Sequence, residues 1–259
     1  MLKRLTLFCA VCWSLSQAFA QQPATTVWSI GQPDGRASEF ALAPDRFRDF
    51  LARDFGYEDK FYLVGHSDPA RDLPYVLPGP VDTWGGTWPT SGWRTHQVNI
   101  LFGLSEEPVS EACRLVVDLA DYAKNFLPLV KVSVNDLDAR FQLDAPGRDL
   151  SRQRKPSLME PVTDTLSLAG NYAEATPRTL EIPLPAGVLH RGGNEIVITV
   201  LEGSWILFDR IALEGPASVR TVRTEQAFVR GVSAAPYRLT EGRRSVQPLL
   251  VDVEWLAGT

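Results

Sequence analysis

The stretch Gln97-Val98-Asn99-Ile100-Leu101-Phe102 (QVNILF) carries a pattern from which the fold class can be inferred. Single residues separate Val98, Ile100 and Phe102, so an extended chain would point all three side chains to one face. The stretch 129–134 repeats this alternation with a valine at every second position. Alternation with a period of two predicts half-buried β-strands rather than helices.

Most other apolar segments are also short and bounded by Gly, Pro, Asn or Asp, which favours strands and turns. We expect strands at residues 26–30, 61–64, 114–119, 178–184, 194–200 and 205–213. Only residues 44–55 show helical spacing, through Phe47, Phe50, Leu51 and Phe55. Strands without a repeated helical partner predict an all-β sandwich or barrel with one short helix.

The first 20 residues have the pattern of a secretory signal peptide. Lys3 and Arg4 precede a short apolar run, and Ala18-Phe19-Ala20 forms a small-x-small cleavage site before Gln21. The apolar run is shorter than the roughly 20 residues that a membrane-spanning helix needs. We therefore expect a secreted or periplasmic protein with no membrane attachment after cleavage.

The cysteine and charge content narrows the class of protein further. Cleavage after Ala20 would leave Cys113 as the single cysteine, so no internal disulfide is expected and the fold must depend on its core. With only three histidines and no Cys/His cluster, we expect no zinc site. The formal net charge of −5 argues against a nucleic-acid partner.

Residues 79–93, GPVDTWGGTWPTSGW, place three tryptophans among turn-forming residues. A pyranose ring has an apolar face that stacks on aromatic rings, and its hydroxyls need polar partners. Trp84, Trp88, Asp82 and His96 supply that mixture and form our candidate carbohydrate site. In the alternative interpretation the same loop folds back as a lid and the tryptophans belong to the core.

Seven strings along the chain resemble the third, accessory domain of rhamnogalacturonan lyases, polysaccharide lyase family 4. They occur in the same order as in that domain: VWSIGQPDG (27–35), FYLVGHSDPARDLPYVLPGPVDTW (61–84), VNILFGL (98–104), RLVVDLADY (114–122), VKVSVND (130–136), LHRGGNEIVITV (189–200) and SWILFDRIALE (204–214). The resemblance implies a jelly-roll β-sandwich of the galactose-binding or carbohydrate-binding-module type. Similar modules are attached to bacterial glycoside hydrolases. Related sandwiches often carry a structural calcium ion, but no acidic motif here assigns a site for one.

Two enzyme classes remain as alternatives. A lyase needs a base to remove the proton beside a uronate carboxylate and a cation to hold the enolate, while a glycosidase needs two carboxylates across a cleft. The candidate bases are His66, His96 and His190, and the candidate carboxylates are Asp68, Asp72, Asp82 and Asp209. Because nothing in the sequence pairs these groups, we assign no catalytic residues and expect the chain not to be catalytic alone.

The tail of the chain allows two interpretations. Residues 222–229 and 246–255 alternate as strands, which could complete the sandwich or begin a further domain. We divide the chain into a signal peptide (1–20), a carbohydrate-binding-like sandwich (21–215) and a C-terminal β tail (216–259). The expected partners are a polysaccharide or oligosaccharide, of which a pectic one is an example, and a catalytic glycosidase or lyase domain. A purely structural domain that packs on such a partner is the further alternative.

Overall fold

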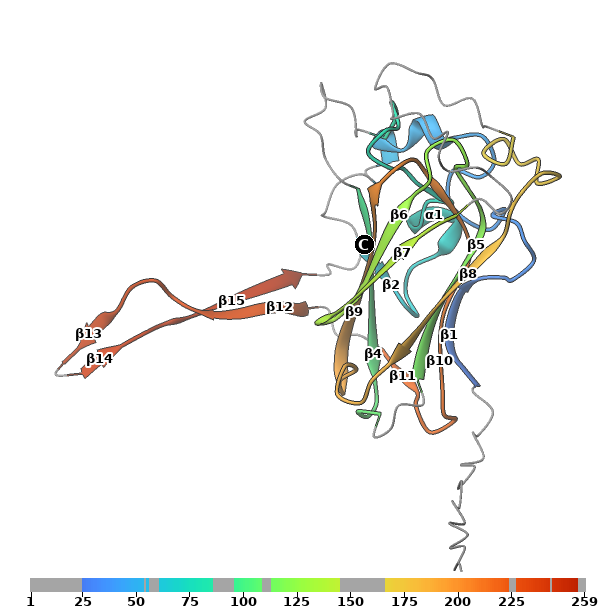
Figure 1. Cartoon of the computed structure of the whole chain (residues 1–259). Coiled ribbons are helices and arrows are strands. Elements are labelled where there is room, and N and C mark those ends of the chain that lie inside the picture. The colour runs from blue at the N-terminus through green and yellow to red at the C-terminus, as the bar shows by residue number, and fades with distance from the viewer. Residues whose placement is uncertain are drawn as a thin grey trace, which may run out of the picture.

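The computed structural model describes residues 25–53, 55, 61–85, 96–108, 113–144, 166–223, 227–242 and 244–255. The strands outside the tail form two sheets packed face to face (Figure 1). The layers are held together by one apolar core. The two sheets and their connections determine where the loops that concern function are placed.

The first sheet is built around two long central strands, β10 and β5. Its strand order is β1 (Thr25–Gly31), β10 (Ile206–Gly215), β5 (Cys113–Tyr122) and β8 (Arg178–Leu184), and the short strand β3 (Val76–Leu77) also pairs with β10. All these pairings are antiparallel. Every strand of this sheet except β3 was expected from the sequence.

The second sheet is centred on β4 and β9. Its strand order is β11 (Thr221–Val222), β4 (Gln97–Leu104), β9 (Gly192–Glu202), β6 (Leu129–Val134) and β7 (Leu137–Gln142), and β2 (Phe61–Leu63) pairs with β4. The β2–β4 pair is parallel, whereas the others are antiparallel. Consecutive strands β8, β9 and β10 alternate between the two sheets, as in a jelly roll. The prediction of an all-β jelly-roll sandwich is therefore confirmed.

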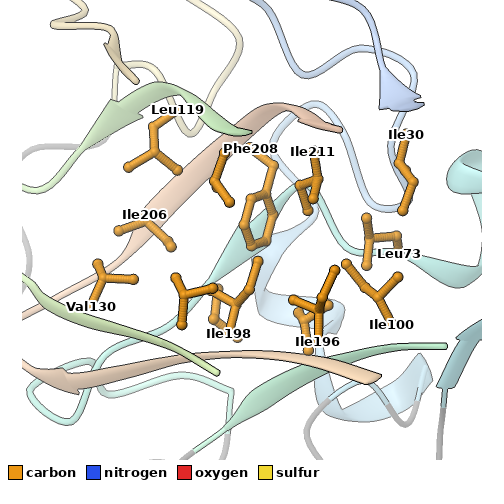
Figure 2. Close-up of a cluster of buried hydrophobic side chains, with 14 of the residues drawn as sticks. Ile30, Leu73, Ile100, Leu119, Val130, Ile196, Ile198, Ile206, Phe208 and Ile211 are labelled. Atoms are coloured by element: carbon orange, nitrogen blue, oxygen red, sulfur yellow. The ribbon is translucent and has the colours of Figure 1, made fainter. Parts of the chain in front are cut away.

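The core consists of the inward-facing rows of both sheets, as the alternation predicted. Ile100 of β4 lies opposite Ile196 of β9, while in the other sheet Leu119 of β5 lies opposite Phe208 of β10. All four are at most 1% exposed, and Figure 2 shows them within one cluster of aliphatic and aromatic side chains. Cys113 is also buried and makes no disulfide, so this core is the main source of stability.

The expected helix at residues 44–55 is wrong. The segment forms two 3₁₀ turns, η1 (Phe47–Asp49) and η2 (Leu51–Arg53), whereas the one α-helix of the described residues is the short α1 (Pro69–Asp72). Phe47 and Phe50 are nonetheless buried, because two tight turns also direct them into the core. Within the described ranges, no helix has the length and apolarity to cross a bilayer.

The tail forms a separate two-stranded arm. Strands β12 (Ala227–Ala234) and β15 (Leu249–Trp255) pair with each other, and β13 (Leu239–Glu241) and β14 (Arg244–Val246) continue the ribbon to its tip. Figure 1 shows this arm extending away from the sandwich. None of its described strands joins either large sheet, so the interpretation in which they complete the sandwich is not supported.

The sandwich extends beyond the boundary expected at residue 215. Val219 is only 6% exposed and belongs to the core, and Thr221 and Val222 form β11 against Leu104 and Gly103 of β4. The structure therefore places the end of the sandwich at Val222. The arm begins after it.

Candidate functional site

Several loops of the described residues meet at one end of the sandwich, and we call it the loop-bearing end. It consists of residues 42–50, 75–85, 123–128, 166–176 and 203–205. Hydrogen bonds tie these segments together: Asp45 N–H and the Tyr75 hydroxyl both donate to the Leu168 carbonyl, at 2.9 and 2.8 Å. This is the end at which β5 finishes and β10 begins, since Tyr122 pairs with Ile206. Loops held on a rigid sandwich in this way commonly carry binding residues.

Asp82 lies inside this end rather than on its surface. Its side chain is 0% exposed, and its carboxylate accepts from Ser204 Oγ at 2.5 Å and from Gly79 N–H at 2.7 Å. Burial raises the pKa of Asp82 to about 7, against the opposing effect of these two hydrogen bonds. The expectation that Asp82 accepts from sugar hydroxyls is corrected, because the carboxylate instead fastens two loops together.

The two loops that Asp82 joins also pack closely through their backbones. A Cβ atom on Gly79 would lie 2.4 Å from the Gly203 carbonyl oxygen, so the two loops touch through their main chains. The Val81 N–H donates to the same carbonyl at 3.2 Å. Asp82 and Ser204 complete this junction with their side chains.

His96 is also buried, at 1% exposure, and its ring packs on that of Phe50 with 5.4 Å between centroids. His96 directly precedes β4 in the sequence and follows the tryptophan-rich stretch 79–93. Its burial excludes contact with a ligand on the surface of this structure. The expectation that His96 contacts a sugar is corrected on that ground.

Trp84 is half-buried at the edge of a cluster of aromatic rings that it forms with Phe47 and Phe50, which we call the aromatic cluster. Its ring meets Phe47 edge-on at 4.9 Å and Phe50 at 6.4 Å, and it is partly buried against the core. Gly85 beside it has a φ of +72° and fits closely over Pro78, so it serves the turn rather than a ligand. Trp88 lies outside the described residues, and the proposed stacking of Trp84 and Trp88 on a sugar stays a prediction.

Three of the other candidate acids and bases have structural partners. Asp209, 6% exposed, accepts from Gly35 N–H at 3.0 Å and Arg36 N–H at 3.3 Å, and burial raises its pKa to about 6. Asp68 caps α1 by accepting from Ala70 N–H. His66 Nε2 accepts from Arg223 Nε at 3.3 Å. Over the described ranges, no group of three His, Cys, Asp or Glu is arranged to hold a metal ion.

A polar pocket of about 500 Å³ opens at the same end, between the turn after β5 and the segment that leads to β8. It is lined by Asp121, Lys124, Asn125, Leu166, Ser167, Asn171, Glu174, Ala175 and Thr176. None of these residues was in the site expected from the sequence. They come from two segments that lie more than 40 positions apart, and the pairing of β5 with β8 brings those segments close to one another.

A family described as "CBM-like: Polysaccharide lyase family 4, domain III" matches residues 26–213. The match covers every strand of the first sheet and all but β11 of the second. The chain belongs to this family. The resemblance inferred from the seven strings is therefore confirmed, and this domain III is an accessory, carbohydrate-associated module.

Two proteins with described activities are similar to parts of this module. Rhamnogalacturonate lyase of Dickeya dadantii (strain 3937) is 30% identical over 208 residues, which cover 77% of this chain and 29% of that protein. The chain thus spans less than a third of its relative. A solved family GH115 4-O-methyl-α-glucuronidase, with specificity for decorated arabinogalactans, is 14% identical over 47% of this chain and 14% of its own, with a TM-score of 0.24. A score this low does not indicate a shared fold.

Sequence reasoning recognised the domain III fold but missed the residues that shape its loop-bearing end. Ser204 gave a weak signal, as a serine beside a glycine and a tryptophan in GSW. Asp121 and Lys124 stand three positions apart at the end of a strand, a spacing that fits a local ion pair. Nothing in the sequence pointed to Ser167.

Proposed function

We propose that this domain III module is exported, binds a polysaccharide at its loop-bearing end, and holds a catalytic lyase or glycosidase partner on that polymer. The observation that carries the proposal is that the family match spans both sheets, so that the loops sit on the scaffold of a CBM-like domain. The polar pocket among those loops supports the placement of the sugar. A pectic polymer is the first candidate, since the curated relative is a rhamnogalacturonate lyase.

Binding without catalysis is also consistent with the chemistry of the described side chains. The acids with strongly raised pKa values, Asp82 and Asp209, are occupied by loop and turn hydrogen bonds. A glycosidase requires two carboxylates facing one another across a cleft. These two are instead buried on separate segments of the fold.

Affinity electrophoresis tests the binding. The protein is run in native gels that contain rhamnogalacturonan, polygalacturonate, arabinogalactan or a cellulose derivative, with bovine albumin as the non-binding reference. We expect retardation in at least one of the pectic gels and none in the cellulose gel. Equal mobility in all four gels and in a plain gel would contradict the proposal.

The proposed export rests on the pattern of residues 1–20, which lie outside the described residues. Expression of the whole chain in a Gram-negative host should deliver protein to the periplasm. Its N-terminus, read by mass spectrometry, should be Gln21. An unprocessed chain retained in the cytoplasm would argue against export.

A further inference from the structure

The pocket at the loop-bearing end has a rigid, buried floor. Asp121 at the end of β5 is 2% exposed, and its carboxylate accepts from Thr176 N–H at 2.9 Å. Lys124 Nζ lies 3.2 Å from the same carboxylate and also donates to the Glu174 carbonyl at 2.6 Å. The floor therefore holds the two lining segments in place before any ligand arrives, which lowers the cost of ordering them on binding.

Ser167 gives the pocket a buried group that lacks a partner. It is 2% exposed, lines the pocket, and its Oγ makes no hydrogen bond to any described residue. A buried hydroxyl without a partner is costly, and most such groups in proteins are satisfied. A ligand hydroxyl in the pocket could both donate to this oxygen and accept from it.

The rest of the lining offers donors, acceptors and one apolar surface. The Asn171 side-chain oxygen is used by Ala173 N–H at 3.1 Å, so its amide NH₂ is the group that remains for a ligand. Glu174 is an exposed carboxylate acceptor at the rim. Leu166 is 49% exposed and supplies apolar surface for a C–H face. The volume of about 500 Å³ is within the range of small-molecule sites, roughly 300–1,000 Å³.

The charges of the described lining disfavour an anionic ligand. Asp121 and Glu174 are both acidic, and Lys124, the cation among these lining residues, is already placed against a carboxylate and a carbonyl. A uronate carboxylate would meet like charges without a cation to receive it. A neutral sugar would meet a carboxylate, an amide and a hydroxyl, each suited to a hydroxyl group.

We propose that this pocket is a binding site for an uncharged sugar residue of the polymer, with Ser167 and Asn171 as hydrogen-bonding partners and Glu174 as the group that discriminates against uronates. The proposal rests on the proposed carbohydrate-binding function and adds to it the place and the class of sugar. This pocket is distinct from the candidate stacking site at Trp84, whose ring packs against Phe47 at the same end of the sandwich.

Calorimetric titration with neutral galactan, arabinan and mannan oligosaccharides, and with an oligogalacturonate of equal length, tests the proposal. We expect a neutral oligosaccharide to be the tightest ligand of the wild-type protein. Ser167→Ala should weaken the affinity for this oligosaccharide by about three- to tenfold, which corresponds to the loss of one neutral hydrogen bond. Because Ser167→Ala also removes an unsatisfied buried hydroxyl, its melting temperature should not fall. Ser233→Ala, an exposed serine of the arm, is the matched control and should change neither quantity.

Glu174→Gln tests the selectivity independently, and because Glu174 is exposed the variant is expected to fold. Glu174→Gln should reduce the difference in binding affinity between the neutral oligosaccharide and the oligogalacturonate. If the wild-type protein prefers the oligogalacturonate, or if Ser167→Ala and Glu174→Gln bind like wild type, this pocket is not the site, while retardation in the affinity gels would still uphold the proposed function. If the wild-type protein binds none of the oligosaccharides and none of the polysaccharides, both proposals fail.

Discussion

At the scale of single residues, Asp82 connects two loops at one end of the sandwich and has an unusual acidity as a result. The carboxylate receives a hydroxyl from Ser204 and an amide from Gly79 while its side chain is completely buried. Burial disfavours the charged form more than these two donors favour it, so its pKa rises from 3.8 to about 7. Ionisation of Asp82 therefore destabilises the folded state relative to the unfolded state.

This acidity predicts a stability that depends on pH. Because the folded-state pKa lies above the unfolded value, the folded protein binds the proton more tightly, and stability should fall as the pH rises from about 4 through about 7. Asp82→Asn keeps the shape of the side chain and removes the titration, so its loss of stability over that range should be smaller than that of wild type. Asp209, with a pKa of about 6, contributes in the same direction in both proteins and cancels in the comparison.

Urea unfolding at pH 5 and pH 8 measures the effect, and the quantity compared is the difference in unfolding free energy between the two pH values. Ser204→Ala is a second variant, which removes a donor to the ionised form and should raise the pKa of Asp82 further. Equal pH dependence in wild type and Asp82→Asn would show that Asp82 does not titrate in this range.

Trp84 decides between a lid and a binding platform. Its ring packs edge-on against Phe47 and Phe50 while part of it remains accessible. Emptying a fully buried aromatic site costs roughly 3–5 kcal/mol, so for this partly buried ring we expect Trp84→Ala to cost about 2 kcal/mol. Chemical denaturation of the variant gives this value. Surface substitutions usually change stability by less than about 0.5 kcal/mol. A change this small for Trp84→Ala, together with a several-fold loss of polysaccharide binding, would instead make the ring a stacking platform.

The expectation that Asp82 and His96 lie on the surface was wrong for a physical reason. Residues 79–93 are rich in turn formers, and polar residues in such a segment are usually exposed, so the sequence favoured a surface site. Gly79 and Gly203 are more than 120 positions apart, and the close approach of their loops, beside which Asp82 is buried, is not encoded in any local pattern. Burial of a polar side chain by distant loops is the kind of feature that sequence periodicity does not reveal.

At the scale of secondary-structure elements, alternation was a reliable guide wherever one face of a strand is buried. The bounds of β6 and β8 were predicted to the residue, because Val130, Val132 and Val134 of β6, like Leu180 and Ile182 of β8, alternate with exposed or half-buried positions. The edge strand β7 was missed, although Leu137, Ala139 and Phe141 form an alternating, half-buried apolar row that packs against the core. The 3₁₀ turns were mistaken for a helix because Phe47 and Phe50 share the spacing of both structures.

The arm is an element with its own prediction. A chain that ends after residue 223 lacks the arm but keeps β11, and it should unfold cooperatively at the melting temperature of the full chain, because the strands of the arm pair with each other. A chain that ends at Gly215 also loses Val219 from the core and β11 from the sheet, so it should melt several degrees lower. Circular dichroism melts of the three proteins give the comparison. A large drop for the chain that ends after residue 223 would show that the arm supports the sandwich.

The arm also exposes apolar side chains that a monomeric sandwich would ordinarily cover. Leu249, Val251 and Val253 alternate along β15, and each is 46–67% exposed. Val232 of β12 pairs with Val251, so one face of the ribbon carries a continuous apolar row. A two-stranded ribbon is at best marginally stable alone.

At the scale of the whole molecule, domain III membership indicates an accessory role, and the chain spans 29% of its lyase relative. We therefore predict that the purified protein forms no unsaturated uronate from rhamnogalacturonan. The ultraviolet absorbance of the product band should stay flat over hours, with an active rhamnogalacturonan lyase as the positive control. A steady increase that His66→Ala or His190→Ala abolishes would make the chain a lyase in its own right.

The most direct test of the central claim, that a polysaccharide binds at the loop-bearing end of this module, is hydrogen–deuterium exchange with and without the pectic polymer that retards the protein most in affinity gels. We predict slower exchange at residues 121–125 and 166–176, which line the pocket, and unchanged exchange in β7 and in the arm. Binding accompanied by protection only in β7 or the arm, with the loop-bearing end unchanged, would contradict the account.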